Sequence, residues 1–190
     1  EGGVELVQRN RLPDSDRVEL TMNLKKKQRL ILWIRKPDWA DKATLIINGK
    51  AEQLLLGNDG YWMIDKVWNR KNRISLQLPM HTYTENLIGT GRYVALLYGP
   101  YVLAGRMGKE NLPSTFWGKM NNTAMNKMDL SKVPVFNIPA TQIPDHVEPV
   151  FERGTLRFNI HLKGFENVVL EPFYKIHFER YAICLLYTSP

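Results

Sequence analysis

The segment RVELTMNL, residues 17–24, alternates apolar and polar side chains without a break. Val18, Leu20, Met22 and Leu24 fall on one face, and the residues between them are polar or charged. Because successive side chains of a β-strand point to opposite sides, this pattern predicts a strand with one face buried and the other in water. Strands of this kind are typical of antiparallel sheets. The segment therefore indicates an all-β fold.

The flanking segments carry similar signals at short intervals. Residues 28–36, QRLILWIRK, are apolar on both faces, with Ile31 and Trp33 on the face opposite to the leucines. Such a strand is expected to be covered on both sides. Asn48-Gly49 predicts a tight hairpin turn. No stretch of ten or more residues has a convincing helical period, so we expect an antiparallel β-sandwich, then a linker and a truncated second β domain.

Changes in composition and in hydrophobic periodicity along the chain set the expected domain boundaries. Apolar runs hinged at Gly99-Pro100 end near residue 106, and residues 107–148 are rich in Pro, Asn and Met without a sustained period. A structureless stretch of this length is uncommon inside one compact domain. We therefore expect a sandwich accessory domain over residues 1–106, an extended linker over 107–148, and the start of a truncated C-terminal β domain over 149–183.

The last seven residues, CLLYTSP, contain the only cysteine of the chain. They match one reading frame of a transposase adaptor used in sequencing libraries. We therefore expect residues 184–190 to be an adaptor-derived artefact on a metagenomic fragment, and Cys184 to have no function. The strands before this junction are expected to pair poorly. The chain starts at Glu1 without a leader, so the natural N-terminus is expected to be missing.

Composition and charge exclude several classes of function. The net charge is +7, but apart from residues 25–27 the basic side chains are scattered, so we expect a solvated surface and no nucleic-acid partner. No apolar run is long enough to span a bilayer. A single cysteine excludes a disulfide framework and a multi-thiolate metal site within this chain, and we expect no cofactor in it.

Acidic pairs are the candidates for hydrolytic chemistry, because hydrolysis of sugars needs two carboxylates about 5–10 Å apart. The nearest pairs along the chain are Asp14 with Asp16 and Glu171 with Glu179. The first pair follows a proline and is better explained as a turn. Sequence alone does not show whether the second pair converges, and we assign no catalytic residue.

Histidines offer one further candidate. His81, His146, His161 and His177 lack the spacing of metal ligands, so no metal site is assigned. In YKIHFERY, residues 174–181, strand alternation would place His177 beside Glu179. A proton shuttle is conceivable there, but a hydrogen bond within a structural strand is the commoner arrangement.

Tryptophans are candidates for stacking on sugars, since the chain has five. Most lie in or beside expected strands, where core packing is the default. Trp39 and Trp117 fall in expected loops and are our candidates for carbohydrate contact. Residues 121–123 also fit a glycosylation sequon, although so short a pattern arises often by chance.

Several stretches resemble, in order, one known family. LWIRKPDWADKATLIINGK, GYWMIDKVWNRKNRISLQLPM and YVALLYGPYVLAG resemble the region after the catalytic barrel in the β-L-arabinofuranosidase family of glycoside hydrolases, family 127 and its relative family 146. VEPVFERGTLRFNI and LEPFYKIHFERYAI resemble a C-terminal domain of unknown function carried by many members from Bacteroidota. The resemblance covers residues 4–183. Lys36 and Lys71 depart from the family pattern in two turns.

The resemblance implies a parent enzyme with an (α/α)₆ catalytic barrel, a cysteine nucleophile, and zinc held by cysteine thiolates and a glutamate. It implies a periplasmic or extracellular location and plant polysaccharide as substrate. None of the catalytic groups maps onto this chain. The implied role is therefore that of a non-catalytic accessory domain that supports the missing barrel of the same polypeptide. The candidates for the barrel interface are Ile31, Trp33, His177 and Arg180.

Two other functions are weighed against this role. An autonomous carbohydrate-binding module should expose two or three coplanar aromatic rings, whereas a support domain should expose a large apolar patch. An immunoglobulin-like adhesin rests on fold analogy alone.

Overall fold

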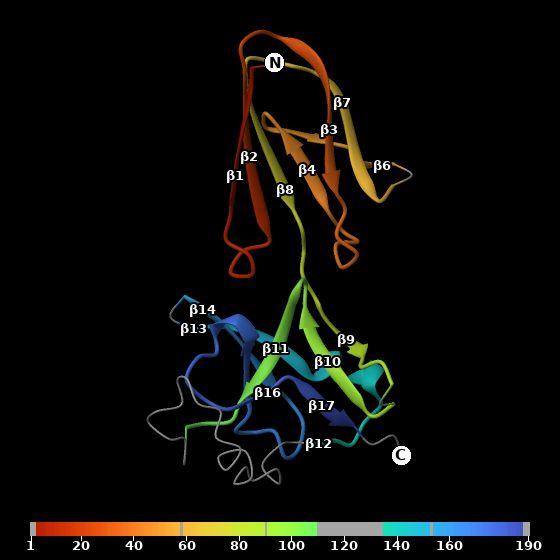
Figure 1. Cartoon of the computed structure of the whole chain (residues 1–190), viewed down its shortest axis with the longest axis vertical. Helices are drawn as coiled ribbons and strands as arrows, with labels where there is room; N and C mark the ends of the chain where they lie inside the picture. The colour runs from red at the N-terminus through yellow and green to blue at the C-terminus, as the bar shows by residue number, and fades with distance from the viewer. Residues whose placement is uncertain (1–2, 58, 90, 110–134, 153, 188–190) are drawn as a thin grey trace. The chain divides into compact units, whose positions relative to one another are not determined.

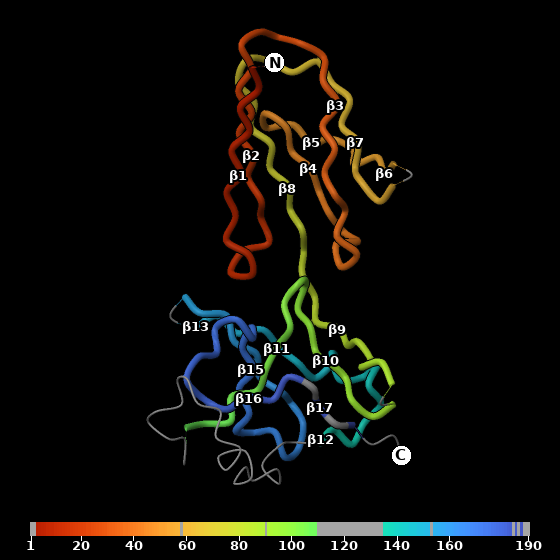
Figure 2. Tube along the Cα trace, viewed as in Figure 1, coloured from red at the N-terminus to blue at the C-terminus, as the bar shows by residue number. Residues whose placement is uncertain are grey.

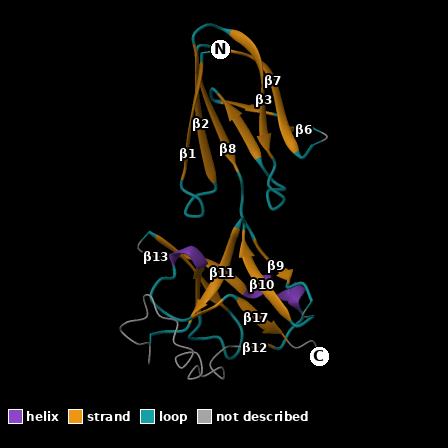
Figure 3. Cartoon of the chain, in the orientation of Figure 1, coloured by secondary structure: helices purple, strands orange, loops and turns teal. Residues whose placement is uncertain are grey.

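The computed structural model describes residues 3–57, 59–89, 91–109, 135–152 and 154–187. The all-β prediction is confirmed: strands dominate, with only short helical turns between them in the described ranges (Figures 1 and 3). The described strands pair antiparallel, apart from one short parallel pair. The chain divides into two compact units, residues 1–81 and 82–190, each of which is described by itself.

The first unit consists of two sheets. The five-stranded sheet contains, in spatial order, β1 (Val4–Asn10), β2 (Arg17–Leu24), β8 (Lys71–Gln77), β4 (Thr44–Ile47) and β5 (Lys50–Glu52). The three-stranded sheet contains β3 (Gln28–Arg35), β7 (Tyr61–Trp68) and β6 (Leu55–Leu56).

One hydrophobic core lies between the two sheets. The apolar face of β2 enters it as predicted, together with Leu45 and Ile47 of β4 and with Trp62 and Trp68 of β7. The inner side chains of β3 pack against the same core. The first unit is therefore an antiparallel β-sandwich, in which each sheet keeps one apolar face inward.

The side chains of Trp68 and Asn72 form hydrogen bonds to backbone groups of the sandwich. The indole Nε1 of Trp68 donates to the carbonyl oxygen of Leu30 at 3.0 Å. Asn72, which is only 2% exposed, accepts from the backbone N–H of Asn69 and donates to the carbonyl oxygens of Asn69 and Met22. Burial without these bonds would be costly, so the amide fixes the turn before β8.

The predicted Asn48-Gly49 hairpin is present between β4 and β5. Ile47 pairs with Lys50, and both turn residues have positive φ angles of 50° and 81°. These are the angles that a two-residue turn of this kind requires.

The second unit is built on one nine-stranded sheet, traced in Figure 2. Its main order is β12-β17-β10-β11-β15-β14-β13, with β9 beside β10 and β16 beside β11. The bounds are β9 (Thr82–Asn86), β10 (Tyr93–Tyr98), β11 (Tyr101–Arg106), β12 (Val135–Phe136), β13 (Val147–Glu152), β14 (Thr155–Ile160), β15 (Val169–Pro172), β16 (Tyr181–Ala182) and β17 (Cys184–Tyr187). Two 3₁₀ turns, η2 (Ala140–His146) and η3 (Phe173–Lys175), complete it.

The division between the units differs from the expected one. It falls after residue 81 rather than 106, because the β10–β11 hairpin pairs with β9, β15, β16 and β17 of the second unit. Part of the expected linker is also structured, since Phe136 and Ile143 are fully buried in the second core. The remainder of that linker, residues 110–134, lies outside the described residues.

The expected strand at residues 173–183 is not continuous. Phe173–Lys175 forms η3, and Phe178 has a φ of +61°, so alternation breaks at both places. Lys175, His177 and Glu179 therefore do not share a strand face. The prolines and glycines that usually mark such breaks are absent from 173–183, so pattern alone suggested a strand.

Cys184–Tyr187, expected to be part of an artefact, forms strand β17 against β10. Leu185 is buried in the second core. An open strand edge is a template for any apolar segment of sufficient β propensity, which explains this pairing whatever the origin of the segment. The adaptor origin of residues 184–190 stays a prediction.

Candidate functional site

The first candidate site is the outward face of the three-stranded sheet. Strand β3 directs Leu30, Leu32 and Ile34 toward the core, so alternation turns Ile31 and Trp33 outward, and each is 49% exposed. Nothing within the described part of the chain covers them completely. The expectation that both faces of this strand are covered is therefore not met within the described part of the chain, where the outer face is half exposed.

Neighbouring strands extend this face. Cross-strand pairing places Met63 opposite Trp33, Leu55 opposite Met63, and Val67 opposite Arg29, so their side chains share one side of the sheet. We name as the apolar face the outward set of Ile31, Trp33, Leu55, Tyr61, Met63 and Val67. Leu55 and Val67 are each 51% exposed. Apolar side chains thus meet at the centre of an open sheet surface.

The position of Trp33 depends on a glycine. A Cβ atom placed on Gly57 would lie 3.0 Å from the indole ring of Trp33 and 3.3 Å from the carbonyl oxygen of Tyr61. The N–H of Gly57 donates to that same oxygen at 2.7 Å. The missing side chain therefore lets the indole lie against the backbone of the β6–β7 connection.

A charged pair lies among the side chains of the apolar face, since Asp65 is opposite Ile31 and Arg29 is opposite Val67. The guanidinium of Arg29 donates to both carboxylate oxygens of Asp65, each at 2.8 Å. These hydrogen bonds lower the pKa of Asp65 and raise that of Arg29. Protein interfaces commonly combine apolar surface with polar and charged groups.

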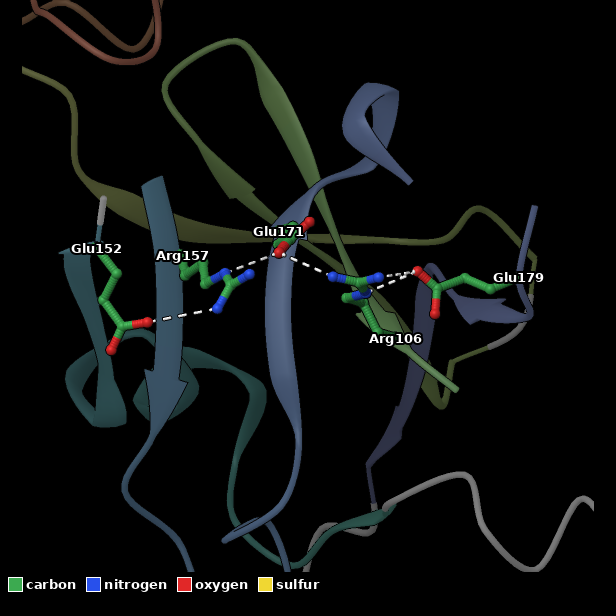
Figure 4. A network of polar contacts seen from close by, with 5 residues as sticks. All are labelled: Arg106, Glu152, Arg157, Glu171 and Glu179. Carbon is green, nitrogen blue, oxygen red and sulfur yellow. Dashed lines mark hydrogen bonds and ion pairs between the residues drawn. The ribbon is translucent and has the colours of Figure 1, made fainter. Parts of the chain in front are cut away.

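The second candidate site is a network of charged residues in the second unit, drawn in Figure 4. We name it the arginine–glutamate network; it contains Arg106, Glu152, Arg157, Glu171 and Glu179. Glu171 on β15 is buried and accepts from Arg106 on β11 at 3.3 Å and from Arg157 on β14 at 3.0 Å. Register places these strands side by side, with β15 in the middle.

The outer members of the network extend it in two directions. Arg157 also donates to Glu152 at 3.3 Å, and Arg106 donates to Glu179 at 2.6 Å. The hydrogen bond to Glu179 raises the pKa of Arg106. Glu171 and Glu179, the candidate acid pair, therefore converge on one guanidinium. Both glutamate side chains are only 6% exposed and bind the same arginine, so they link strands to a loop and are not placed to act on a substrate.

The other acid pair behaves as the turn interpretation expects. The backbone oxygen of Asp16 accepts from Leu78, and its carboxylate accepts from Gln77 at 3.1 Å. The N–H of Arg17 donates to the hydroxyl of Ser15.

The residues proposed for binding occupy different places. Trp39 is partly buried and packs against the core of the first unit, and Trp117 lies outside the described residues. His177 is exposed with its ring 6.1 Å from that of Phe178. The backbone of Arg180 pairs with Met107 and Gly108. Neither His177 nor Arg180 is on the unit that carries Ile31 and Trp33.

Sequence reasoning missed three features of these sites. Leu55 and Val67 were not assigned to the surface, because their place follows from pairing with β7 and β3. Phe178 was assigned to a regular strand. The burial of Glu171 had one sequence signal: it follows VVL and precedes a proline at the end of a short apolar strand.

The described residues contain no group of three or more His, Cys, Asp and Glu side chains arranged to hold a metal ion. Across those same ranges, no helix is both long and apolar enough to cross a membrane.

Residues 83–187, almost the whole second unit, match the model of the family DUF4986, a domain of unknown function. The chain belongs to the DUF4986 family. The segment before its DUF4986 domain, residues 1–80, matches a model described as the beta-L-arabinofuranosidase GH127 middle domain. The boundary between the two matches coincides with the division between the structural units.

Solved structures similar to this DUF4986 chain include glycoside hydrolases. One is a GH127 beta-L-arabinofuranosidase from Geobacillus stearothermophilus T6, at 16% identity and a TM-score of 0.65, over 97% of this chain and 31% of that one. Another is a GH127 beta-arabinofuranosidase, at 15% identity and a TM-score of 0.61, over 97% of this chain and 32% of that one. These likenesses show the fold. No curated protein sequence gives a significant match.

Proposed function

We propose that this chain is a non-catalytic accessory part of a glycoside hydrolase resembling β-L-arabinofuranosidases, and that it supports a catalytic barrel elsewhere in the same polypeptide. The match to a GH127 middle domain supports the class of enzyme. The chain spans about a third of the length of the similar solved structures, which supports a larger parent.

The observation that carries the proposal is the apolar face. Ile31, Trp33 and Leu55 are each about half exposed on a sheet whose other side is already packed. Contiguous exposed apolar surface of this kind marks an interaction site. Covering the exposed half of one such side chain contributes about 1 kcal/mol, so the face favours a docked partner over water.

The alternative is an autonomous carbohydrate-binding module. It requires coplanar exposed rings, but two contacting pairs with an exposed ring in the described part of the chain are tilted: Tyr101 with Tyr174 by 47° and Phe173 with Tyr181 by 58°. Trp39 packs against the core. These arrangements favour the support role.

The test uses the parent polypeptide in two pieces, its catalytic segment and these 190 residues. We expect the pieces to associate, and Trp33→Ser to weaken that association at least tenfold. Ile46→Ser is the matched control, since Ile46 is 42% exposed on the outward side of the other sheet. Equal effects of both substitutions, or no association, would contradict the proposal.

Affinity electrophoresis on arabinan and arabinogalactan distinguishes the support role from the carbohydrate-binding module. Retardation of the 190-residue chain in either gel would favour the carbohydrate-binding module. We expect unchanged mobility.

The resemblance to β-L-arabinofuranosidases also supports a parent that acts on plant polysaccharide in the periplasm or outside the cell. Fractionation of cells that express the full gene tests this location. Recovery of the parent in the cytoplasmic fraction alone would contradict it.

A further inference from the structure

Strand β1 of the first unit leaves its core-facing side uncovered. It pairs with β2, and the register places Val4 opposite Leu24 and Leu6 opposite Met22. Directly opposite residues of an antiparallel pair point to the same face of the sheet, so Val4 and Leu6 point to the side that carries the core. Met22 is 3% and Leu24 5% exposed, whereas Val4 is 47% and Leu6 48% exposed. The cover of the core therefore ends between two neighbouring strands.

The connections between the two sheets explain where the cover ends. Residues 25–27 join β2 to β3 and residues 69–70 join β7 to β8, both at one end of the sandwich (Figure 1). So few residues just span the separation of about 10 Å between packed sheets, so the strands that they join lie face to face. Strand β3 therefore lies opposite β2, and β7 lies opposite β8. Since β3 is the last strand of its sheet, no described strand lies opposite β1.

We name the place beside β3 and opposite β1 the open position. On the β3 side, the inward residues Leu30, Leu32 and Ile34 are only partly buried. Those of the next strand, Trp62 and Trp68 of β7, are 4% and 1% exposed. Burial thus decreases from β7 to β3 in one sheet and from β2 to β1 in the other. The open position is therefore lined by apolar side chains from both sheets.

Backbone groups of β3 also face the open position. The N–H of Lys36 donates to the carbonyl oxygen of Gly60, so the even-numbered residues of β3 direct their N–H and C=O groups toward β7. The alternate residues, Ile31 and Trp33 among them, direct theirs to the other edge, with which no described strand pairs. A row of unpaired donors and acceptors is a template for another strand. An apolar lining beside such a row fits an extended chain, whereas a helix leaves the row unpaired.

We propose that a β-strand from the remaining part of the parent polypeptide occupies the open position, pairs with β3 and covers Val4 and Leu6 with its apolar side chains. The inference rests on the proposed function, which assigns these residues to a longer polypeptide. The chain spans 31% and 32% of two similar solved structures, so a parent of that length has ample chain to supply a strand. Because such a strand is tethered, its effective concentration is high and one strand suffices.

The first arm of the test compares hydrogen exchange in the 190-residue chain and in the full-length parent, at single-amide resolution. In the chain alone, we expect fast exchange of the Ile31 and Trp33 amides and slow exchange of the Leu32 amide, which faces β7. In the parent, we expect the Ile31 and Trp33 amides to exchange at least tenfold more slowly. Unchanged exchange of these two amides would overturn the proposal.

Two other occupants of the open position are outcomes of the same measurement. Slow exchange of the Ile31 and Trp33 amides in the monomeric 190-residue chain would overturn the proposal in favour of a segment within this chain. Slow exchange that appears only when this chain dimerises, and not in a monomeric parent, would assign the position to a second copy. Sedimentation of the same samples establishes their oligomeric state.

The second arm uses the two-piece parent described above and compares neighbouring residues of β1. Leu6→Ser changes a side chain that points to the open position. Val7→Ser is the matched control, because Val7 is 38% exposed and points to the opposite face of the same strand. We expect Leu6→Ser to weaken association at least tenfold and Val7→Ser to leave it unchanged. Both substitutions should change the Tm of the 190-residue chain alone equally. A lower Tm for Leu6→Ser alone would assign Leu6 to the core of this chain and overturn the proposal.

Failure of this inference is distinguishable from failure of the proposed function. If Trp33→Ser weakens association and Leu6→Ser behaves like Val7→Ser, the support function stands and the inserted strand is disproved. If the pieces do not associate, the proposed function fails. Exchange of the Ile31 and Trp33 amides in the full-length parent then still decides whether a strand is inserted beside β3.

Discussion

Glu171 accepts a hydrogen bond from Nε of Arg157 at 3.0 Å, between neighbouring strands of the second unit. Only 6% of the carboxylate side chain is exposed, whereas Arg157 is 38% exposed. The carboxylate is thus the fixed point of the network, because an arginine can turn toward water while a buried anion cannot.

We predict that Glu171→Ala destabilises the second unit by about 3 kcal/mol, since it leaves two guanidinium groups without their shared acceptor. Glu152→Ala is the matched control: this carboxylate also binds Arg157 but is 60% exposed, so its loss should cost less than about 1 kcal/mol. Urea unfolding followed by hydrogen exchange of β14 and β15 measures both. Equal losses of stability in the two variants would show that the burial of Glu171 does not increase its contribution to the fold.

The buried amide of Asn72 leads to a second prediction, for the first unit. Asn72→Ala removes three hydrogen bonds of a buried amide, two to Asn69 and one to Met22, each worth about 1 kcal/mol, so we expect a cost of about 2–3 kcal/mol. Asn23→Ala, which loses one exposed bond to Glu5, should change stability by less than about 0.5 kcal/mol. Four of the five tryptophans lie in the first unit, so their fluorescence during denaturation reports its unfolding.

The Arg29–Asp65 pair predicts a pH dependence. Hydrogen bonds from Arg29 lower the pKa of Asp65 in the folded state. A carboxyl whose folded pKa is depressed stabilises the fold above its unfolded pKa, about 3.9, and this contribution disappears as the pH falls through the folded pKa.

Arg29→Gln should therefore return the pKa of Asp65 toward its ordinary value and flatten the acid limb of the stability profile below about pH 4. A carboxyl carbon titration by NMR measures the pKa directly. An unchanged midpoint in the variant would show that the pair has no influence on this group.

Strand β17 gives a fourth prediction, which bears on the origin of the C-terminal residues. Leu185 is 2% exposed in the second core, so Leu185→Ala should destabilise the second unit by about 2–4 kcal/mol. Deletion of residues 184–190 should be at least as costly, because it also removes the strand that pairs with residues 93–95 of β10, whose remaining partner at Val94 and Ala95 is β9. A deletion that leaves thermal unfolding unchanged would mean that these residues contribute nothing to the fold.

Much of the first unit was predictable, because its signals are local. Alternation in residues 17–24 correctly placed four side chains in the core, and Asn48-Gly49 correctly predicted a hairpin. The outward direction of Ile31 and Trp33 also followed from alternation. Which residues join them on the apolar face did not, since strands β6 and β7 are distant in sequence.

The strand pairing of the second unit and the break within residues 173–183 were not predictable from these local signals. The pattern of residues 93–104 correctly predicts strands. It does not predict their pairing with β15 and β17, because other distant strands have equivalent patterns. Residues 173–183 alternate like a strand, but Ile176 is held in the core and Glu179 is held by Arg106, and these contacts override local preference.

By itself the sequence determined the all-β class, the core face of β2 and the resemblance to the accessory domains of a glycoside hydrolase, because these depend on period, turn residues and motif order. Only the tertiary structure decided where the units divide, that Glu171 and Glu179 share Arg106, and that Phe178 is held outward in a strained conformation. The physical reason is that pairing, burial and charge contacts join residues far apart in the chain, and no local pattern records which distant partner is chosen.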